Sequence, residues 1–215
     1  MYGGVFKAVP VWGPTNFTFG IRRNVTSSER SSLEQLVAAL KASATDGAAS
    51  EKRAPPVELW NPTHCGDAGL EILRDGTWLH QGTRMTRESL VRLFASILRK
   101  DADGETYLVT PVEKIRVRVE DAPFLAVRVD RDGQGPEQNL VFTTNVGDVV
   151  IAGPGNPIRV NYTGDEPRPY VLVRGRLEAR ILRAPFYEMI EWSECHDGRL
   201  GVWSGGVWFE LGAAP

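Results

Sequence analysis

The sequence is poor in the residues from which most catalytic and metal sites are built. It has two cysteines, Cys65 and Cys195, and three histidines among 215 residues. Two cysteines are too few for the disulfide framework that holds small secreted domains together. No run of about 18 apolar residues occurs, so no membrane-spanning helix is expected. Residues 1–30 lack a basic lead followed by an apolar stretch, so the sequence predicts no secretory signal and a cytoplasmic location.

The charge balance excludes a second group of functions. The formal net charge is −2, so the molecule as a whole has no attraction for polyanions. We therefore expect neither an anionic membrane nor duplex nucleic acid as a partner. The 42% of hydrophobic and 24% of charged residues are typical of a globular chain. A chain of this length forms one large domain or two small ones.

The first quarter of the chain differs from the rest. Residues 1–30 follow neither a strand period nor a helix period, which predicts a disordered tail. Residues 31–56 are expected to form a short helix and then a linker rich in Ala and Ser that ends in two prolines. The helix is predicted from an apolar stripe at helical spacing, made of Leu33, Leu36, Val37 and Leu40.

The compact body is predicted to start near Val57. Asp75-Gly76 lies between apolar segments and is typical of a tight hairpin turn, since the turn needs positive φ at both positions. Thr86 is expected to cap a helix whose apolar face runs from Leu90 to Leu98. Short strands are then expected over 107–110, 115–119, 124–129, 140–143, 149–152 and 158–162.

The longest alternating segment covers residues 170–181. Its pattern predicts one long strand with an apolar face and a polar face, and Gly175 marks a bend or bulge in it. A helix over 185–192 and a terminal hairpin around residues 202–209 are expected to follow. The predicted fold class is α+β: two small domains of mainly antiparallel sheet, each with a helix, a repetition that hints at duplication.

Several ordered motifs in this body resemble one bacterial family. They include Asp75-Gly-Thr-Trp-Leu-His-Gln-Gly, Tyr107-Leu-Val-Thr-Pro-Val-Glu-Lys114 and Val119-Glu-Asp-Ala-Pro-Phe124. Together with the helix between the first two and with Leu177-Glu-Ala-Arg180, they resemble the domain-of-unknown-function family numbered 1285, from about residue 57 to the C-terminus. The Arg84-Met85 pair departs from the Pro-Ile that the family usually has there. Residues 1–30 look foreign to the family, as if the start codon lay too far upstream.

The resemblance implies a two-part fold. It places an N-terminal α+β domain over 57–118 and a β-rich domain over 119–215, the latter similar to pleckstrin-homology-like barrels and related to the former by duplication. It implies no established activity. It does imply that a small, nucleotide-like ligand of a signalling pathway binds where the two domains meet.

The leading hypothesis is therefore a regulatory or sensory module, not an enzyme, that binds a small anion between its domains. Guanidinium groups spaced along a strand can grip phosphate or carboxylate oxygens. Arg174, Arg176 and Arg180 share the polar face of the predicted strand. The other expected ligand-binding residues are Lys114, Trp78 and His80, the last because an imidazole changes charge near neutral pH. A row of arginines on one face of a strand is more commonly just a solvent-exposed face than a ligand site.

Two alternatives stay open. One is an enzyme in which Glu113, Glu120 or Asp121 works with His80 at the same cleft. The other is a protein-interaction domain that uses the aromatic side chains of the last hairpin, namely Trp203, Trp208 and Phe209.

No cofactor, metal site or catalytic set is predicted. The pairs His64-Cys65 and Cys195-His196 lack the ligand spacing of structural zinc sites, and adjacent residues of a strand point apart. No serine stands in a Gly-X-Ser-X-Gly context.

Overall fold

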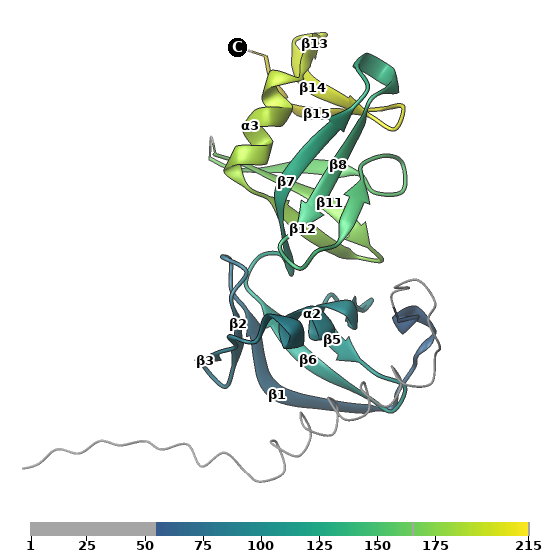
Figure 1. Cartoon of the computed structure of the whole chain (residues 1–215), viewed down its shortest axis with the longest axis vertical. Coiled ribbons are helices and arrows are strands. Elements are labelled where there is room, and N and C mark those ends of the chain that lie inside the picture. Colours follow the sequence, from purple (N-terminus) through teal and green to yellow (C-terminus); the bar gives the residue numbers. More distant parts are fainter. Residues whose placement is uncertain (1–54, 165, 215) are drawn as a thin grey trace, which may run out of the picture.

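The computed structural model describes residues 55–164 and 166–214, and the expected tail and first helix lie outside them. Two six-stranded sheets follow one another along the chain, and a smaller sheet of three strands ends it. Figure 1 shows the two halves stacked end to end along the long axis. The fold is thus α+β with two sheet-rich halves, as predicted from the sequence.

The first half begins with the 3-10 turn η1 (Val57–Leu59) and contains one helix, α2 (Glu88–Ser96). Its strands pair in the order β3-β2-β1-β6-β5-β4. Their bounds are β1 (His64–Ile72), β2 (Trp78–His80), β3 (Thr83–Arg84), β4 (Leu98–Lys100), β5 (Thr106–Val109) and β6 (Glu113–Val119). The Asp75-Gly76 turn joins β1 to β2 as expected. Positive φ was expected at both residues, but only Gly76 has it, at +80°, and Asp75 does not.

The second half pairs its strands in the order β10-β11-β12-β7-β8-β9. Its elements are β7 (Phe124–Asp132), η2 (Gly135–Glu137), β8 (Asn139–Thr144), β9 (Val149–Ile151), β10 (Ile158–Thr163), β11 (Glu166–Arg174), β12 (Leu177–Ile181) and α3 (Arg183–Glu191). The terminal sheet is formed by β13 (Glu194–His196), β14 (Arg199–Ser204) and β15 (Val207–Ala213). A helix directly after a curled sheet fits the pleckstrin-homology-like barrel that the resemblance implied.

The two six-stranded sheets share one topology. Each is made of two three-stranded meanders, and the first and last strands of the six lie side by side at the centre. These central pairs, β1 with β6 and β7 with β12, are parallel, whereas the other neighbouring strands pair antiparallel. The repeated scheme is consistent with duplication. The helices differ in place, since α2 precedes the fourth strand of its sheet and α3 follows the sixth of its own.

The core is continuous through both halves. The largest fully buried side chains come from both sheets and from the end of α2: Trp78, Phe94, Phe124, Phe142, Leu70, Ile72, Ile97, Leu98, Leu108, Ile115 and Leu140. Burial of this apolar surface is the main force that holds the halves together. None of the described helices is long and apolar enough to cross a membrane.

Three expectations about secondary structure were wrong. Residues 170–181 form a hairpin, not one strand, because Gly175 at φ +53° turns the chain between β11 and β12. The helix begins at Glu88 after Arg87, without a side-chain cap from Thr86, and it ends at Ser96. Leu98 already belongs to β4, an element that the sequence pattern did not distinguish from the helix.

Candidate functional site

The two expected residues on β2 serve the core of the first half. Trp78 is 2% exposed, and its ring lies 6.4 Å from that of Phe94. The indole nitrogen of Trp78 and Nε2 of His80 are buried and have no hydrogen-bond partner among the described residues. Neither residue belongs to the lining of the cavity that Arg176 borders. The structure thus separates both residues from the arginines with which they were grouped.

Lys114 is occupied by an ion pair within the first half. Its Nζ lies 2.9 Å from Oδ2 of Asp101 and 4.2 Å from the ring centroid of Tyr107. The bond to Asp101 raises the pKa of the Lys114 ammonium. Asp101 also accepts a 2.6 Å bond from Arg99. Burial raises the pKa of the Asp101 carboxyl, but the bonds from Arg99 and Lys114 outweigh burial and leave that pKa below its ordinary 3.8.

Arg174 links the two halves of the molecule. One terminal nitrogen pairs with Asp148 at 2.6 Å, and the other donates to the carbonyl oxygen of Ala95 at 2.5 Å, near the end of α2. Its guanidinium carbon lies 4.9 Å from the ring centroid of Phe124. The last carbonyls of a helix lack partners within the helix and carry partial negative charge. Arg174 supplies such a partner, so its charge is used in holding the halves together.

Arg180 is also occupied. It pairs with Oδ2 of Asp121 at 3.1 Å, and the other oxygen of that carboxylate accepts a 2.7 Å bond from the Tyr170 hydroxyl. Burial, followed by this bond, raises the pKa of Tyr170. Because Asp121 lies between β6 and β7, this group fixes the connection between the halves.

Arg176 differs from the other expected residues. It sits at the turn between β11 and β12 and is exposed, and its Nη1 lies 3.4 Å from the carbonyl oxygen of Asp101. That distance is long for an N–H···O bond, whose usual range is about 2.7 to 3.2 Å. Arg176 borders a cavity between the halves.

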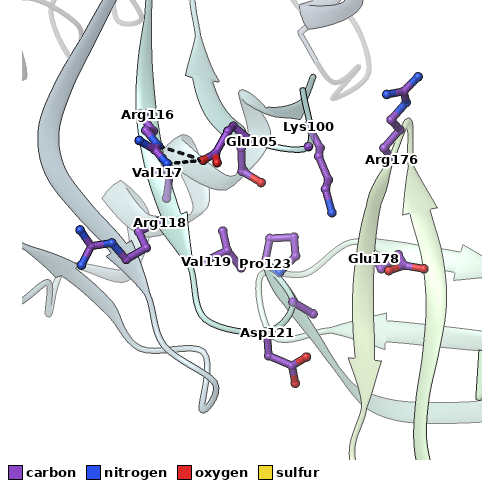
Figure 2. Close-up of a pocket in the computed structure, with 13 residues that line it drawn as sticks. Lys100, Glu105, Arg116, Val117, Arg118, Val119, Asp121, Pro123, Arg176 and Glu178 are labelled. Atoms are coloured by element: carbon purple, nitrogen blue, oxygen red, sulfur yellow. Dashed lines mark hydrogen bonds and ion pairs between the residues drawn. The ribbon is translucent and has the colours of Figure 1, made fainter. Parts of the chain in front are cut away.

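This cavity, which we call the interdomain cleft, has a volume of about 270 Å³. It is bordered by β4, β5 and β6 of the first half, by the segment between β6 and β7, and by the start of β12. Its lining consists of Lys100, Gly104, Glu105, Thr106, Arg116, Val117, Arg118, Val119, Asp121, Ala122, Pro123, Arg176 and Glu178. In Figure 2, the Lys100 side chain extends into the gap between the first sheet and the β11–β12 hairpin, while Arg176 stands at the tip of that hairpin.

Most charged side chains of the interdomain cleft already have partners. Arg116 pairs with Glu105 at 2.8 Å, and Arg118 pairs with Glu71 at 3.2 Å. Glu178 accepts two hydrogen bonds from Arg159, from Nε at 2.5 Å and from Nη2 at 2.6 Å.

Asp121 is held by Arg180, as described above. In the described part of the chain, this leaves Lys100 and Arg176 as the cleft's charged groups without an ion pair.

The sequence did not point to Lys100. The residue follows an apolar helical pattern and precedes Asp101, so it was included in the end of the expected helix. In the structure Lys100 ends β4 and pairs in register with Thr106 of β5. Only a recognisable β-strand pattern between the helix and the Asp101 turn could have indicated, from the sequence, that Lys100 lies on a strand.

A second, more open groove of about 510 Å³ lies elsewhere between the halves. It is bordered by Gly76 and Arg84 of the first half and by Asn145 and Val146 of the second. Arg84 has no ion pair within the described residues, but the segment from the second half contributes no cation to this groove. The interdomain cleft is therefore the better candidate for an anion that contacts both halves.

The residues of the alternative enzyme site are used elsewhere. Glu120 accepts the backbone N–H of Arg74 at 2.8 Å and pairs with its guanidinium at 3.4 Å. Glu113 pairs in register with His64, at the opposite end of β6 from Glu120. No hydrogen bond joins His80 to any of the three carboxylates in the part of the chain that the structure describes.

Two aromatic side chains of the last hairpin lie against His196. Trp203 and Trp208 are opposite each other on β14 and β15, and His196 stands edge-on to their rings at 6.2 and 5.8 Å. Phe209 is buried, at 6% exposure. Both cysteines are free and exposed, and no cluster of three metal-ligating side chains occurs within residues 55–164 and 166–214.

Comparison with known proteins gives a consistent result. Residues 55–122 match the family model described as "Domain of unknown function (DUF1285), N-terminal domain", and residues 123–211 match "Protein of unknown function (DUF1285), C-terminal domain". None of the curated proteins matches the chain.

Two crystal structures are similar to this chain. A DUF1285 family protein from Silicibacter pomeroyi DSS-3 is 50% identical with a TM-score of 0.72, over 81% of this chain and 94% of that one. A DUF1285 family protein from Shewanella baltica OS155 is 33% identical over 58% of this chain and 91% of that one, with a TM-score of 0.47.

Proposed function

Since the chain belongs to the DUF1285 family, whose name assigns no activity, we propose a function from the interdomain cleft. The protein is a regulatory or sensory binding module that holds a small anionic ligand in this cleft. It acts in the cytoplasm, the location that the sequence predicts. Lys100 and Arg176 carry the binding, in place of the larger set of residues expected from the sequence.

The unpaired charges of the cleft are the observation that supports this proposal. A lysine and an arginine from different halves line one cavity in which the neighbouring charges are neutralised in pairs. An anion that enters the cleft gains charge-assisted hydrogen bonds without breaking an existing ion pair. The same anion would have to displace a carboxylate at Lys114, Arg174 or Arg180.

The position of the cleft supports a regulatory role. Lys100 belongs to β4 and Arg176 to the β11–β12 turn, so a ligand held by both restricts movement of one half against the other. A ligand that binds one arrangement better shifts the population toward it. Such a module reports ligand concentration through the relative position of its halves, and it needs no chemical step.

The test is a thermal-shift screen of phosphates and small carboxylates with the full chain. Binding to the native state alone stabilises it by about 2.7 kcal/mol at a hundredfold excess over Kd. For a chain of this size we expect the melting temperature to rise by about 5 to 11 °C. Lys100→Gln and Arg176→Gln should each remove most of this shift.

Arg84→Gln is the matched control, because Arg84 is an exposed arginine without an ion pair among the described residues and borders the other groove. It should leave the shift unchanged. A ligand whose effect survives both cleft substitutions but disappears in Arg84→Gln would contradict the proposal.

A further inference from the structure

The make-up of the interdomain cleft also limits the chemistry of its ligand. We infer, on the basis of the proposed function, that the ligand is a small sugar or polyol that carries a single phosphate group, and not a nucleotide. The phosphate binds Lys100 and Arg176, and the hydroxyl groups bind the carboxylates on the cleft wall. This differs from the nucleotide-like ligand that the family resemblance implied.

The first argument is the absence of a surface on which a base can stack. Protein sites for unpaired bases commonly use aromatic side chains, and each stacked base contributes about 1 to 3 kcal/mol. The described lining of the cleft contains no aromatic side chain, and its apolar part is formed by Val117, Val119, Ala122 and Pro123. A purine or pyrimidine would therefore gain little from this cleft.

The second argument is the charge of the lining. The lining contains four cations, Lys100, Arg116, Arg118 and Arg176, and three carboxylates, Glu105, Asp121 and Glu178. Among the described residues all of these except Lys100 and Arg176 have an ion-pair partner, so two positive charges are not neutralised. One phosphate group, with about −1.5 to −2 charge at neutral pH, matches the two unpaired cations. The second and third phosphates of a nucleoside triphosphate would lie against the carboxylates.

The third argument is that the carboxylates can still accept hydrogen bonds. A carboxylate has about four acceptor positions. Glu178 uses two for Arg159, and Asp121 uses two for Arg180 and Tyr170. The remaining positions suit hydroxyl donors, and hydroxyl groups are the donors that a sugar or polyol offers in number.

The volume of the cleft agrees with a ligand of this size. At about 270 Å³ it lies just below the range of about 300 to 1,000 Å³ typical of sites for drug-sized ligands. A dinucleotide or a coenzyme is larger than the cleft allows, whereas a phosphorylated monosaccharide is compact enough.

Calorimetric titration of the full chain tests this inference. The probes are glucose phosphate, ribose phosphate and glycerol phosphate, compared with adenosine monophosphate, inorganic phosphate and free glucose. We expect at least one phosphorylated polyol to bind more tightly than all three comparison compounds. Lys100→Gln and Arg176→Gln should each weaken it about tenfold or more, the effect of losing a charged hydrogen bond. Glu178→Gln should weaken the phosphorylated polyol but not inorganic phosphate, and Arg84→Gln should change neither.

The other outcomes separate this inference from the proposed function. If adenosine monophosphate or inorganic phosphate binds as tightly as every phosphorylated polyol, and binding depends on Lys100, the inference is overturned and anion binding in the cleft stands. If no probe binds, or if Lys100→Gln and Arg176→Gln both leave the affinity unchanged, the assignment of phosphate binding to the cleft fails as well.

Discussion

Arg174→Met offers the sharpest test of how the two halves are held together. The substitution keeps much of the aliphatic stem but removes the guanidinium that joins Asp148 of the second half to the carbonyl oxygen of Ala95 in the first. The Arg174 side chain is 25% exposed and that of Asp148 36% exposed, so water compensates part of the loss.

Hydrogen bonds to charged groups contribute about 1.5 to 3 kcal/mol each when well formed. After discounting for solvent exposure, we expect Arg174→Met to lower the free energy of unfolding by about 2 to 3 kcal/mol. The assay is equilibrium urea unfolding followed by circular dichroism.

The matched control is Arg176→Met, two residues away on the same hairpin. Because Arg176 is exposed and, among the described residues, makes a single long hydrogen bond of 3.4 Å to Asp101, its substitution should change the free energy of unfolding by less than about 0.5 kcal/mol. The reasoning is refuted if the two variants are equally stable, since Arg174 would then be as free as Arg176.

Two further predictions concern local packing and pH. Gly201→Ala should lower the free energy of unfolding by about 1 to 3 kcal/mol, because the added Cβ would lie 2.2 Å from Cζ2 of Trp208. The control is Gly155→Ala, whose added Cβ has no atom within 4 Å. Thermal melts of both variants should show a lower melting temperature for Gly201→Ala and no change for Gly155→Ala. Asp101→Asn should be less stable than the unchanged protein at neutral pH. The pKa of Asp101 is held below 3.8 in the folded protein. The difference in stability between the two proteins is therefore fully present above pH 3.8 and should shrink as the pH falls below 3.8. If the difference between their urea midpoints stays constant from neutral pH down to pH 3, the ion-pair assignment is contradicted.

Local pattern was enough to predict most of the fold. The alternation around Ile115 and Val117 corresponds to β6, and the Asp75-Gly76 turn is a hairpin. The helix expected over 185–192 is present, but it begins two residues earlier, at Arg183. The prediction of one strand over residues 170–181 was wrong because a hairpin with a two-residue turn keeps nearly the same alternation of apolar and polar residues as an unbroken strand. Only the positive φ of Gly175 separates the two structures, and glycine allows that angle without requiring it.

The sequence alone determined the fold class, the family and the presence of an arginine-rich alternating segment in the second half. It could not determine which of those arginines are free, because their partners lie far away along the chain: Arg174 contacts Ala95, and Arg180 pairs with Asp121. Tertiary structure decided that these charges hold the molecule together, and it brought Lys100 and Arg176 to one cleft. Ion pairing depends on distances of a few ångströms between side chains, and these distances exist only once the two sheets have packed.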